Sequence, residues 1–239
     1  MKKIIKKIIR KTFIYNLIKY PHKVLMLHNL EHGIILNNAL RYIPWIKSPF
    51  FPGGGAASYS LLYSLLRILI EAAPQKICEL GSGQTTNLFL QFIKSNNRQL
   101  ISVEGNSEWY HYFSQKFQKI KNFHYIYSPL KEKKVLGIKT SWYSCNLLEK
   151  NINLLLIDGP KGVKNFSRVG VIDYIPNILS HKFFIIIDDY QRKGEKQTTK
   201  SIMEKLKKHN ISFVTKLVRG YTSQFIIASS NYECLLFAI

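Results

Sequence analysis

Short apolar runs that alternate with helical patterns characterise the chain from residue 76 onward. The predicted strands are 76–80, 99–103, 123–127, 153–157, 183–187, 212–218 and 224–228, and the predicted helices are 85–94, 107–119, 169–179 (interrupted by Pro176) and 195–209. Such an alternation predicts an α/β fold that is doubly wound, with a mostly parallel sheet between two layers of helices. Ligands bind these sheets at the carboxyl ends of the strands, so the residues after each strand are the candidates for function.

The first 23 residues have a helical pattern, and the pattern between residues 20 and 51 is irregular. In residues 1–23, isoleucines recur at helical spacing, eight Lys or Arg residues are present, and acidic residues are absent. This predicts a basic amphipathic helix that lies on an anionic membrane surface through residues 1–19. The alternative is a helix that packs its isoleucines on the domain and solvates its lysines. Residues 24–75 are predicted to form a helical extension with a helix over 56–73.

Charge and composition limit the partners and the cellular location that we expect for this protein. The 239 residues include 35 Lys and Arg against 14 Asp and Glu, and the net charge of +21 favours polyanionic partners such as nucleic acid, anionic lipid or acidic glycan. No arginine-rich or zinc-finger element accompanies this charge, so nucleic acid is the weaker expectation. The apolar runs are too short to cross a bilayer. Three widely spaced cysteines favour a reducing cytoplasm, with any membrane contact at the inner face of the cell membrane.

A glycine loop follows the first predicted strand. Residues 79–85 read E-L-G-S-G-Q-T, and the next helix presents free N–H groups to whatever this loop cradles. The second strand ends in Glu104, and an acidic side chain there can accept hydrogen bonds from both hydroxyls of a ribose. The combination of strand, acid, Gly-x-Gly, helix, second strand and terminal acid is more specific than Gly-x-Gly alone.

This arrangement resembles the first motif and the ribose-binding acid of the class I S-adenosylmethionine-dependent methyltransferases. The resemblance extends over about residues 76–228. It implies a Rossmann-like domain over residues 76–239 that has seven strands, the last of them antiparallel, and it implies S-adenosylmethionine as the cofactor. The cofactor-binding residues that it implies are Glu79, Gly81, Ser82, Gly83, Gln84, Thr85, Glu104, Gly105 and Asp158.

Other interpretations of the glycine loop stay open. The interpretation as a nicotinamide-dependent enzyme is less well supported, because Thr86 occupies the position where a third glycine would open the helix. A Rossmann-like domain without a cofactor is a further alternative, although packing alone does not require the combined pattern. The third strand runs into Ser128-Pro129, where the family often has an acid or an amide. The adenine of the cofactor would therefore be contacted by Ser128, by backbone groups or by stacking.

Acidic residues also follow the fourth and fifth predicted strands. Asp158 ends the fourth strand, and Asp188 and Asp189 end the fifth. Crowded carboxylates repel unless a cation lies among them, so one prediction is a divalent ion such as Mg²⁺ or Mn²⁺ held by these three residues. Metal-dependent O-methyltransferases of the catechol type show a similar arrangement. One alternative is a metal-free general base, Asp158 or Asp188. In another, Asp189 only caps the next turn and Asp158 holds the amino group of the cofactor.

Basic residues are predicted to line the mouth of the site. Lys161, Arg168 and Arg192 lie in segments that resemble methyltransferases of sugars and glycans, including enzymes of capsule and other surface-polysaccharide assembly. Such cations suit an anionic acceptor, for example a uronic acid or a nucleotide-sugar. We therefore expect an O-methyltransferase that acts on a sugar hydroxyl of a glycan or glycan precursor. Its candidate catalytic residues are Asp158, Asp188 and Arg168.

Two alternatives come from other functional classes. A nucleic-acid methyltransferase agrees with the charge, but D-G-P-K follows the fourth strand in place of an Asn/Asp-Pro-Pro-Tyr/Phe signature. A non-catalytic membrane-peripheral scaffold of polysaccharide assembly agrees with the N-terminal helix, but a scaffold has no need for Glu104. The aromatic candidates for stacking on a sugar or on adenosine are Trp109, Trp142, Tyr143 and Tyr190.

Overall fold

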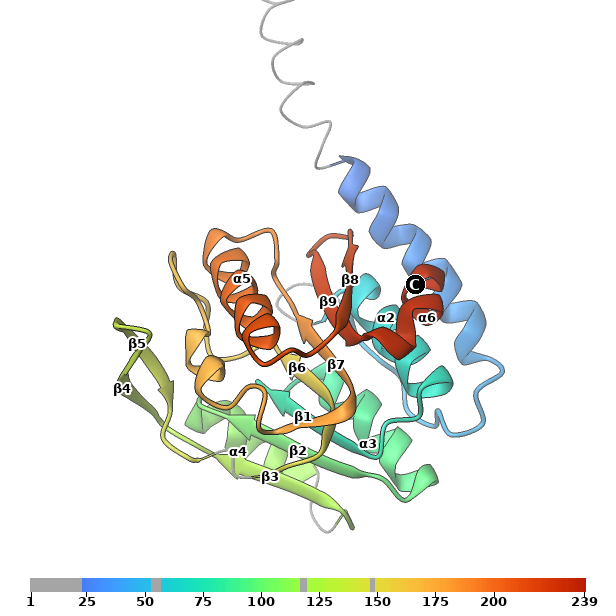
Figure 1. Cartoon of the computed structure of the whole chain (residues 1–239). Helices are drawn as coiled ribbons and strands as arrows, with labels where there is room; N and C mark the ends of the chain where they lie inside the picture. The colour runs from blue at the N-terminus through green and yellow to red at the C-terminus, as the bar shows by residue number, and fades with distance from the viewer. Residues whose placement is uncertain (1–22, 53–56, 117–119, 147–148) are drawn as a thin grey trace, which may run out of the picture.

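A mixed sheet of seven strands forms the centre of the structure (Figure 1), a computed structural model that describes residues 23–52, 57–116, 120–146 and 149–239. The strand order is β3-β2-β1-β6-β7-β9-β8, and only β9 runs antiparallel to the others in this sheet. The sheet confirms the predicted doubly wound, Rossmann-like fold with a final antiparallel strand. Its strands are β1 Lys76–Leu80, β2 Gln99–Glu104, β3 Phe123–Tyr127, β6 Ile152–Ile157, β7 Leu179–Ile187, β8 Phe213–Val218 and β9 Gln224–Ser229.

The central strands are apolar at successive positions because both faces of the sheet are covered. Along β6, Leu154 and Leu156 belong to the core on one face, whereas Leu155 and Ile157 belong to the core on the other. Side chains alternate across a strand, so each face receives every second residue. This double burial explains why the predicted strands read as continuous apolar runs.

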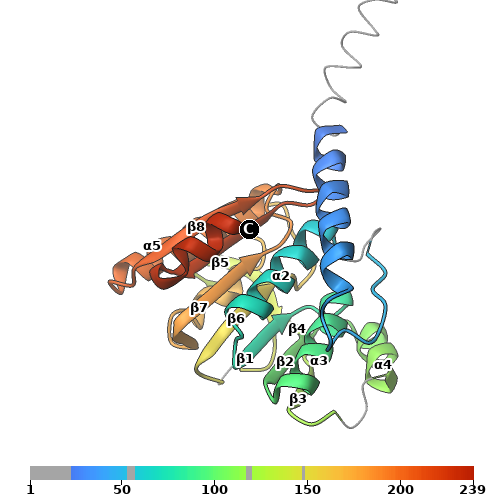
Figure 2. The same cartoon turned by 90° about the vertical axis from the view of Figure 1, so that its right-hand side faces the viewer.

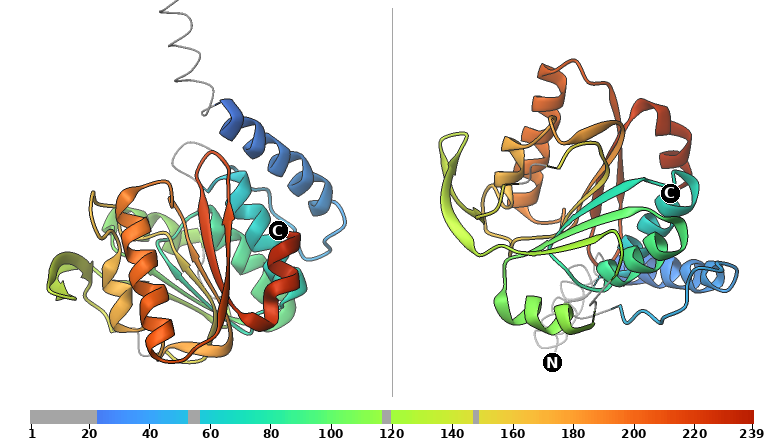
Figure 3. Two further views of the ribbon diagram at one scale, coloured as in Figure 1. Left: turned by 45° about the horizontal axis from the view of Figure 1, so that its top comes forward. Right: turned by 90° about the horizontal axis from the view of Figure 1, so that it is seen from below.

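Helices cover both faces of the sheet (Figure 3, left). Buried residues of α2 and α3 join the core on one face, together with residues of α6. Residues of α5 and of the 3-10 helix η1 join the core on the other face. The bounds are α2 Tyr59–Glu71, α3 Gln84–Asn96, α4 Ser107–Lys116, η1 Val169–Asp173, α5 Lys193–Lys208 and α6 Glu233–Ala238.

The segment between β3 and β6 differs from the prediction. In place of a polar stretch, the structure has a separate antiparallel hairpin of β4 Leu130–Val135 and β5 Ile138–Tyr143. Leu136 and Gly137, both with positive φ, form its two-residue turn, which matches the twist of the strands. Most residues of β4 are exposed, so the strand lacks the apolar run of the buried strands. The helix predicted over 169–179 is also shorter, since only η1 is helical and β7 already begins at Leu179.

The helical extension before the sheet is confirmed for two segments. Residues 23–40 form a helix, and α2 follows after an irregular connection. The side chains of α2 are part of the main core, so the extension and the sheet share one core. The basic helix predicted over 1–23, and with it the membrane contact through 1–19, lies outside the described residues except for Lys23. Within the described part of the chain, every helix is too short or too polar to span a membrane.

Candidate functional site

A cavity of about 1150 Å³ opens where β1, β2, β6 and β7 end. It collects residues from four loops that are far apart in the sequence, which is the expected place for a ligand in a sheet of this type. Most of the predicted site residues line it, whereas Glu79 and Asp188 do not. The predicted residues in the lining are Gly81, Ser82, Gly83, Gln84, Thr85, Glu104, Gly105, Asp158, Lys161, Arg168, Asp189 and Arg192.

The glycine loop passes close under the end of β6. Gly81 has a φ of +91°, and a Cβ atom there would lie 3.0 Å from the backbone nitrogen of Gly159. A side chain at position 81 would therefore be strained and would also crowd the neighbouring loop. Gly83 differs, because a Cβ atom there would have no neighbour within 4 Å. Its missing side chain leaves the floor of the cavity open to a ligand.

Glu104 is fixed at the wall of the cavity. Its Oε2 accepts hydrogen bonds from the backbone N–H of Ser82 at 3.0 Å and from the Ser82 hydroxyl at 2.8 Å. Its Oε1 accepts one from the N–H of Asn106 at 2.8 Å. The indole of Trp109 donates to the carbonyl oxygen of Ser82 at 2.7 Å. These bonds fix an acceptor-only group at the wall of the cavity, and its contact with a ribose stays a prediction.

Glu79 lies beneath the loop, so the structure corrects the prediction that it touches the cofactor. Its side chain is fully buried and accepts hydrogen bonds from the hydroxyls of Thr85, Thr86 (2.6 Å) and Ser102 (2.8 Å). Burial raises the pKa of Glu79 to about 7, against the opposing effect of these hydroxyls. Thr85 and Thr86 belong to the first turn of α3. Glu79 therefore positions the start of α3 and, through it, the loop.

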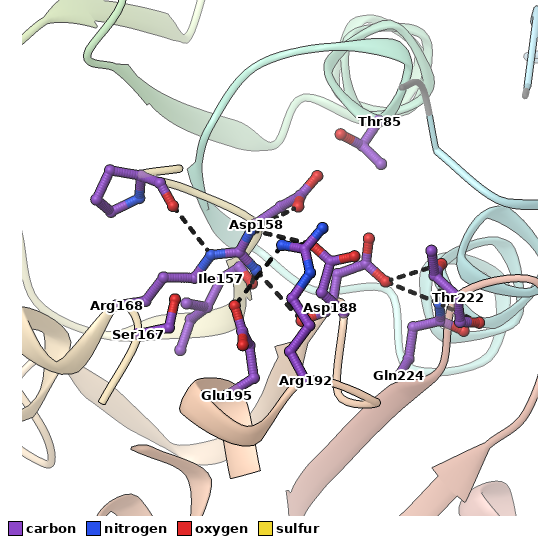
Figure 4. A network of polar contacts seen from close by, with 12 residues as sticks. Thr85, Ile157, Asp158, Ser167, Arg168, Asp188, Arg192, Glu195, Thr222 and Gln224 are labelled. Carbon is purple, nitrogen blue, oxygen red and sulfur yellow. Dashed lines mark hydrogen bonds and ion pairs between the residues drawn. The ribbon is translucent and has the colours of Figure 1, made fainter. Parts of the chain in front are cut away.

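Three carboxylates lie close together at the ends of β6 and β7, and Figure 4 shows two of them, Asp158 and Asp188. Asp158, Asp188 and Asp189 can each offer one oxygen within 4.8 Å of the others. The Oδ1 of Asp188 accepts hydrogen bonds from the side chains of Gln224 at 2.8 Å and Thr222 at 3.3 Å. Since Asp188 is held in this way and does not line the cavity, Asp158 is the better placed of the two candidate bases. The prediction that all three lie together is supported by this geometry.

The carboxylates of Asp158 and Asp188 resist ionisation. The pKa of Asp158 lies well above its usual range, because its carboxyl, 33% exposed, is partly desolvated and faces Asp188; Arg168 opposes this shift. Burial also raises the pKa of Asp188, against the hydrogen bond from Gln224. A carboxylate whose pKa is raised is a stronger base than an ordinary aspartate.

Arg168 is the cation among these carboxylates. It is 3% exposed, and it bonds Asp158 at 3.4 Å and Asp189 at 3.2 Å through Nη2. Its Nε and Nη1 donate to three backbone carbonyl oxygens, those of Pro160, Ile157 and Asp188. All five N–H groups of a guanidinium thus have acceptors. These contacts favour a positioning role, in which Arg168 ties the ends of β6 and β7 together, and its predicted catalytic role stays a prediction.

The fit of a divalent metal can be judged from the same contacts. Three carboxylate oxygens at this spacing are the donors that Mg²⁺ or Mn²⁺ prefers. However, Oδ2 of Asp189 already accepts from Arg168 at 3.2 Å and from Arg192 at 2.7 Å. Arg168 and Arg192 thus already compensate the negative charge for which the sequence analysis predicted a metal cation. The metal stays a prediction, and the chemistry below is derived without it.

Arg192 lies at the mouth of the cavity and is 48% exposed. It is held by Asp189 on one side and lies 3.8 Å from Oε1 of Glu195 on the other. Glu195 is fully buried, and its two oxygens have no hydrogen-bond partner among the described residues. The sequence prediction did not include Glu195 in the site. An acid in the first turn of a helix was the available signal, and it is common at helix starts that have no function.

The aromatic candidates fall into two groups. Trp109 and Tyr143 line the cavity. Trp142 is buried and packs over Gly170, and Tyr190 stacks on Phe225 with ring centroids 4.6 Å apart. Of the four, only the first two can face a ligand in this cavity. Two further lining residues, Tyr112 and Leu130, were missed by the sequence analysis.

Ser128 does not reach the cavity, so it is not the contact to adenine that the sequence left open. It is buried, and its hydroxyl accepts a hydrogen bond from the N–H of Cys145 at 2.8 Å. The lining on this side is instead formed by Leu130 of the hairpin and Trp109 of α4. Backbone groups, apolar contact and stacking are the remaining ways to hold a purine ring here.

Comparisons with known proteins show similarity of fold at low sequence identity. No protein-family model matches the chain, and no curated protein matches it. A precorrin-6y C5,15-methyltransferase from Geobacter metallireducens GS-15 is 11% identical, with 71% of this chain and 88% of that chain covered and a TM-score of 0.48. A Staphylococcus aureus protein provisionally assigned as a caffeoyl-CoA O-methyltransferase is 16% identical, with 92% and 100% covered and a TM-score of 0.46. Similarity at this level concerns the arrangement of the chain alone, so the function depends on the residues of the cavity.

Proposed function

We propose that this protein is an S-adenosylmethionine-dependent O-methyltransferase that acts on a hydroxyl of an anionic glycan or nucleotide-sugar. The observation that carries the proposal is the cavity itself. It joins the glycine loop and Glu104 at one end to Asp158, Lys161 and Arg192 at the other. A nucleoside-bearing methyl donor and an acidic acceptor would therefore meet in one cavity.

The cofactor would bind at the end formed by β1 and β2. Glu104 would accept hydrogen bonds from the two ribose hydroxyls, and the adenine would lie against Trp109 and Leu130. The first N–H groups of α3 have no partner within the helix and face the glycine loop, which suits the carboxylate of the methionine moiety. Because Gly83 carries no side chain, the ligand can approach the backbone closely.

Asp158 would act as the general base. The acceptor hydroxyl gives its proton to the Asp158 carboxylate while its oxygen attacks the methyl carbon. The bond from that carbon to the sulfonium sulfur breaks, and its electron pair stays on sulfur. The products are a methyl ether and S-adenosylhomocysteine, with the proton on Asp158. Holding both reactants in line supplies a large part of the rate, and the base adds to it.

The acceptor would be anionic because the mouth of the cavity is cationic. Lys161 and Arg192 line it together, and Asp189 fixes one nitrogen of Arg192 at 2.7 Å. A guanidinium held in this way keeps further N–H groups for a carboxylate or phosphate. A uronic acid or a nucleotide-sugar offers such groups beside a hydroxyl that can be methylated.

Two measurements, made one after the other, test the proposal. Titration calorimetry of the full chain with S-adenosylmethionine should give saturable binding, and the absence of binding would refute the proposal. Transfer of a radiolabelled methyl group is then measured with UDP-glucuronate and with UDP-glucose, which lacks the carboxylate. Faster transfer to the uronate is the expected result. A preference for RNA or DNA, with salt-dependent retention in gel shifts, would support the nucleic-acid alternative instead.

A further inference from the structure

The helix over residues 23–40 carries an uncovered row of apolar residues. Met26, Leu27, Leu30 and Ile34 share one face, because residues three or four positions apart are neighbours on a helix. Each is between 53% and 65% exposed. We call these four residues the apolar stripe. Lys23 and Arg41, both exposed, continue the same spacing at its two ends.

The opposite face of this helix attaches it to the domain. Gly33 lies against the ring of Tyr59, where a Cβ atom would come within 3.2 Å of the ring. The ring centroids of His32 and Tyr63 are 5.4 Å apart, and Leu36 is buried in the main core. Figures 1 and 2 show the beginning of the helix projecting beyond the rest of the fold. The apolar stripe is therefore presented outward by a helix that is anchored through its other face.

A contiguous exposed apolar row marks an interaction surface more often than single exposed residues do. The charge of the chain indicates what covers it. Residues 1–22, which lead into this helix, carry seven Lys or Arg residues and no acid, and the whole chain has a net charge of +21. A second copy of the chain would bring two such segments together, which repel each other, whereas an anionic surface attracts them.

We propose that the apolar stripe is a membrane-contact surface that holds the protein on anionic phospholipid. The helix would lie in the plane of the interface, with the stripe among the acyl chains and with Lys23 and Arg41 at the headgroups. The basic residues before position 23 would add attraction over a longer range. This surface does not depend on the proposed catalytic activity, so either can fail without the other.

The test is co-sedimentation of the full chain with phospholipid vesicles. The wild-type protein should sediment with phosphatidylcholine vesicles in which about a third of the lipid is replaced by phosphatidylserine, and much less with pure phosphatidylcholine. The double variant Leu27→Glu and Leu30→Glu should bind the anionic vesicles at least about tenfold more weakly, since it loses apolar contact and adds negative charge. Both positions are exposed, and thermal unfolding followed by circular dichroism shows whether the fold is kept.

A matched control separates the stripe from charge alone. Ser95→Glu with Gln115→Glu adds the same charge at exposed positions of α3 and α4, and its vesicle binding should stay within about twofold of the wild type. Equal binding by the Leu27/Leu30 variant and the wild type would overturn the proposal. A wild-type protein that does not sediment with anionic vesicles would overturn it as well. A wild-type dimer that becomes monomeric in the Leu27/Leu30 variant, measured by light scattering, would identify a second copy as the occupant instead.

Discussion

The two ends of the cavity are held together by different interactions. At the cofactor end, the loop of residues 81–83 and Glu104 are joined by hydrogen bonds that involve backbone N–H groups and short side chains. At the acceptor end, Arg168 binds Asp158 and Asp189, which come from two separate strands. Hydrogen bonds to one carboxylate stabilise the first end, whereas opposite charges compensate each other at the second.

This difference determines what a substitution changes at each end. Removing the Glu104 carboxylate leaves three donors of Ser82 and Asn106 without their partner, which lowers stability modestly but leaves no charge unpaired. A buried charge that compensates others cannot be removed without leaving them unpaired. Substitutions at the cofactor end should therefore change affinity, and those at the acceptor end should change catalysis or stability.

The largest effect is expected from Asp158→Asn. The change keeps the shape of the side chain but removes the proton acceptor, so methyl transfer should fall by about 10²–10⁴-fold. Binding of S-adenosylmethionine should change little. Asp188→Asn is the matched control, since an amide oxygen can still accept from Gln224 and Asp188 does not line the cavity. A larger loss in Asp188→Asn than in Asp158→Asn would assign the base to Asp188.

Replacing Arg168 should affect stability most. Arg168→Met leaves Asp158 and Asp189 without their buried partner, which should lower the free energy of unfolding by about 3–5 kcal/mol. Arg192→Met is the control, because Arg192 is half exposed and its ion pair should contribute less than about 1 kcal/mol. Urea unfolding of both variants measures the difference. Equal destabilisation would show that Arg168 is not the central compensating charge.

Glu104→Ala should weaken the binding of the cofactor without unfolding the protein. Hydrogen bonds from a ribose to a carboxylate contribute about 1.5–3 kcal/mol, so the affinity for S-adenosylmethionine should fall by about tenfold to a hundredfold. Glu132→Ala removes the same charge from an exposed position of the hairpin and should leave the affinity unchanged. Unchanged affinity in a folded Glu104→Ala variant would refute the assignment of the ribose site.

The pH dependence of methyl transfer sharpens the assignment of the base. Asp158 must be ionised to accept a proton, and burial beside Asp188 raises its pKa. As the pH falls below that raised pKa, Asp158 binds a proton and the rate should drop about tenfold per pH unit. This acid limb should lie well above pH 4, where an ordinary aspartate titrates. A rate that falls only near pH 4, as for an ordinary aspartate, would contradict a raised pKa at the base.

Chelation should have the smallest effect. Because Arg168 and Arg192 already compensate the carboxylates, EDTA should leave both methyl transfer and cofactor affinity unchanged. Added Mg²⁺ should not increase the rate. Loss of transfer in EDTA with recovery in Mg²⁺ or Mn²⁺ would instead establish the metal that the three aspartates predicted from sequence.

The sequence by itself determined which segments of the chain form the buried strands of the sheet and which loops contribute to the candidate site. Apolar runs identify buried strands because both faces of the sheet must be covered, and Gly81 and Glu104 follow strand ends where ligands bind. It missed the β4–β5 hairpin, because a strand that is mostly exposed does not require an apolar run. These successes and failures have one cause, since periodicity reports only burial.

Tertiary structure alone decided the roles of the charged residues. Glu79 and Glu104 both read as cofactor ligands in the sequence, yet one is fully buried under the loop and the other lines the cavity. Arg168 read as a surface or catalytic cation, but folding surrounds it with five acceptors. The spacing of residues along a chain fixes which loop they enter, whereas burial and partners depend on segments that meet only after folding. For a charged group, these partners decide whether it binds a ligand, moves a proton or holds the fold together.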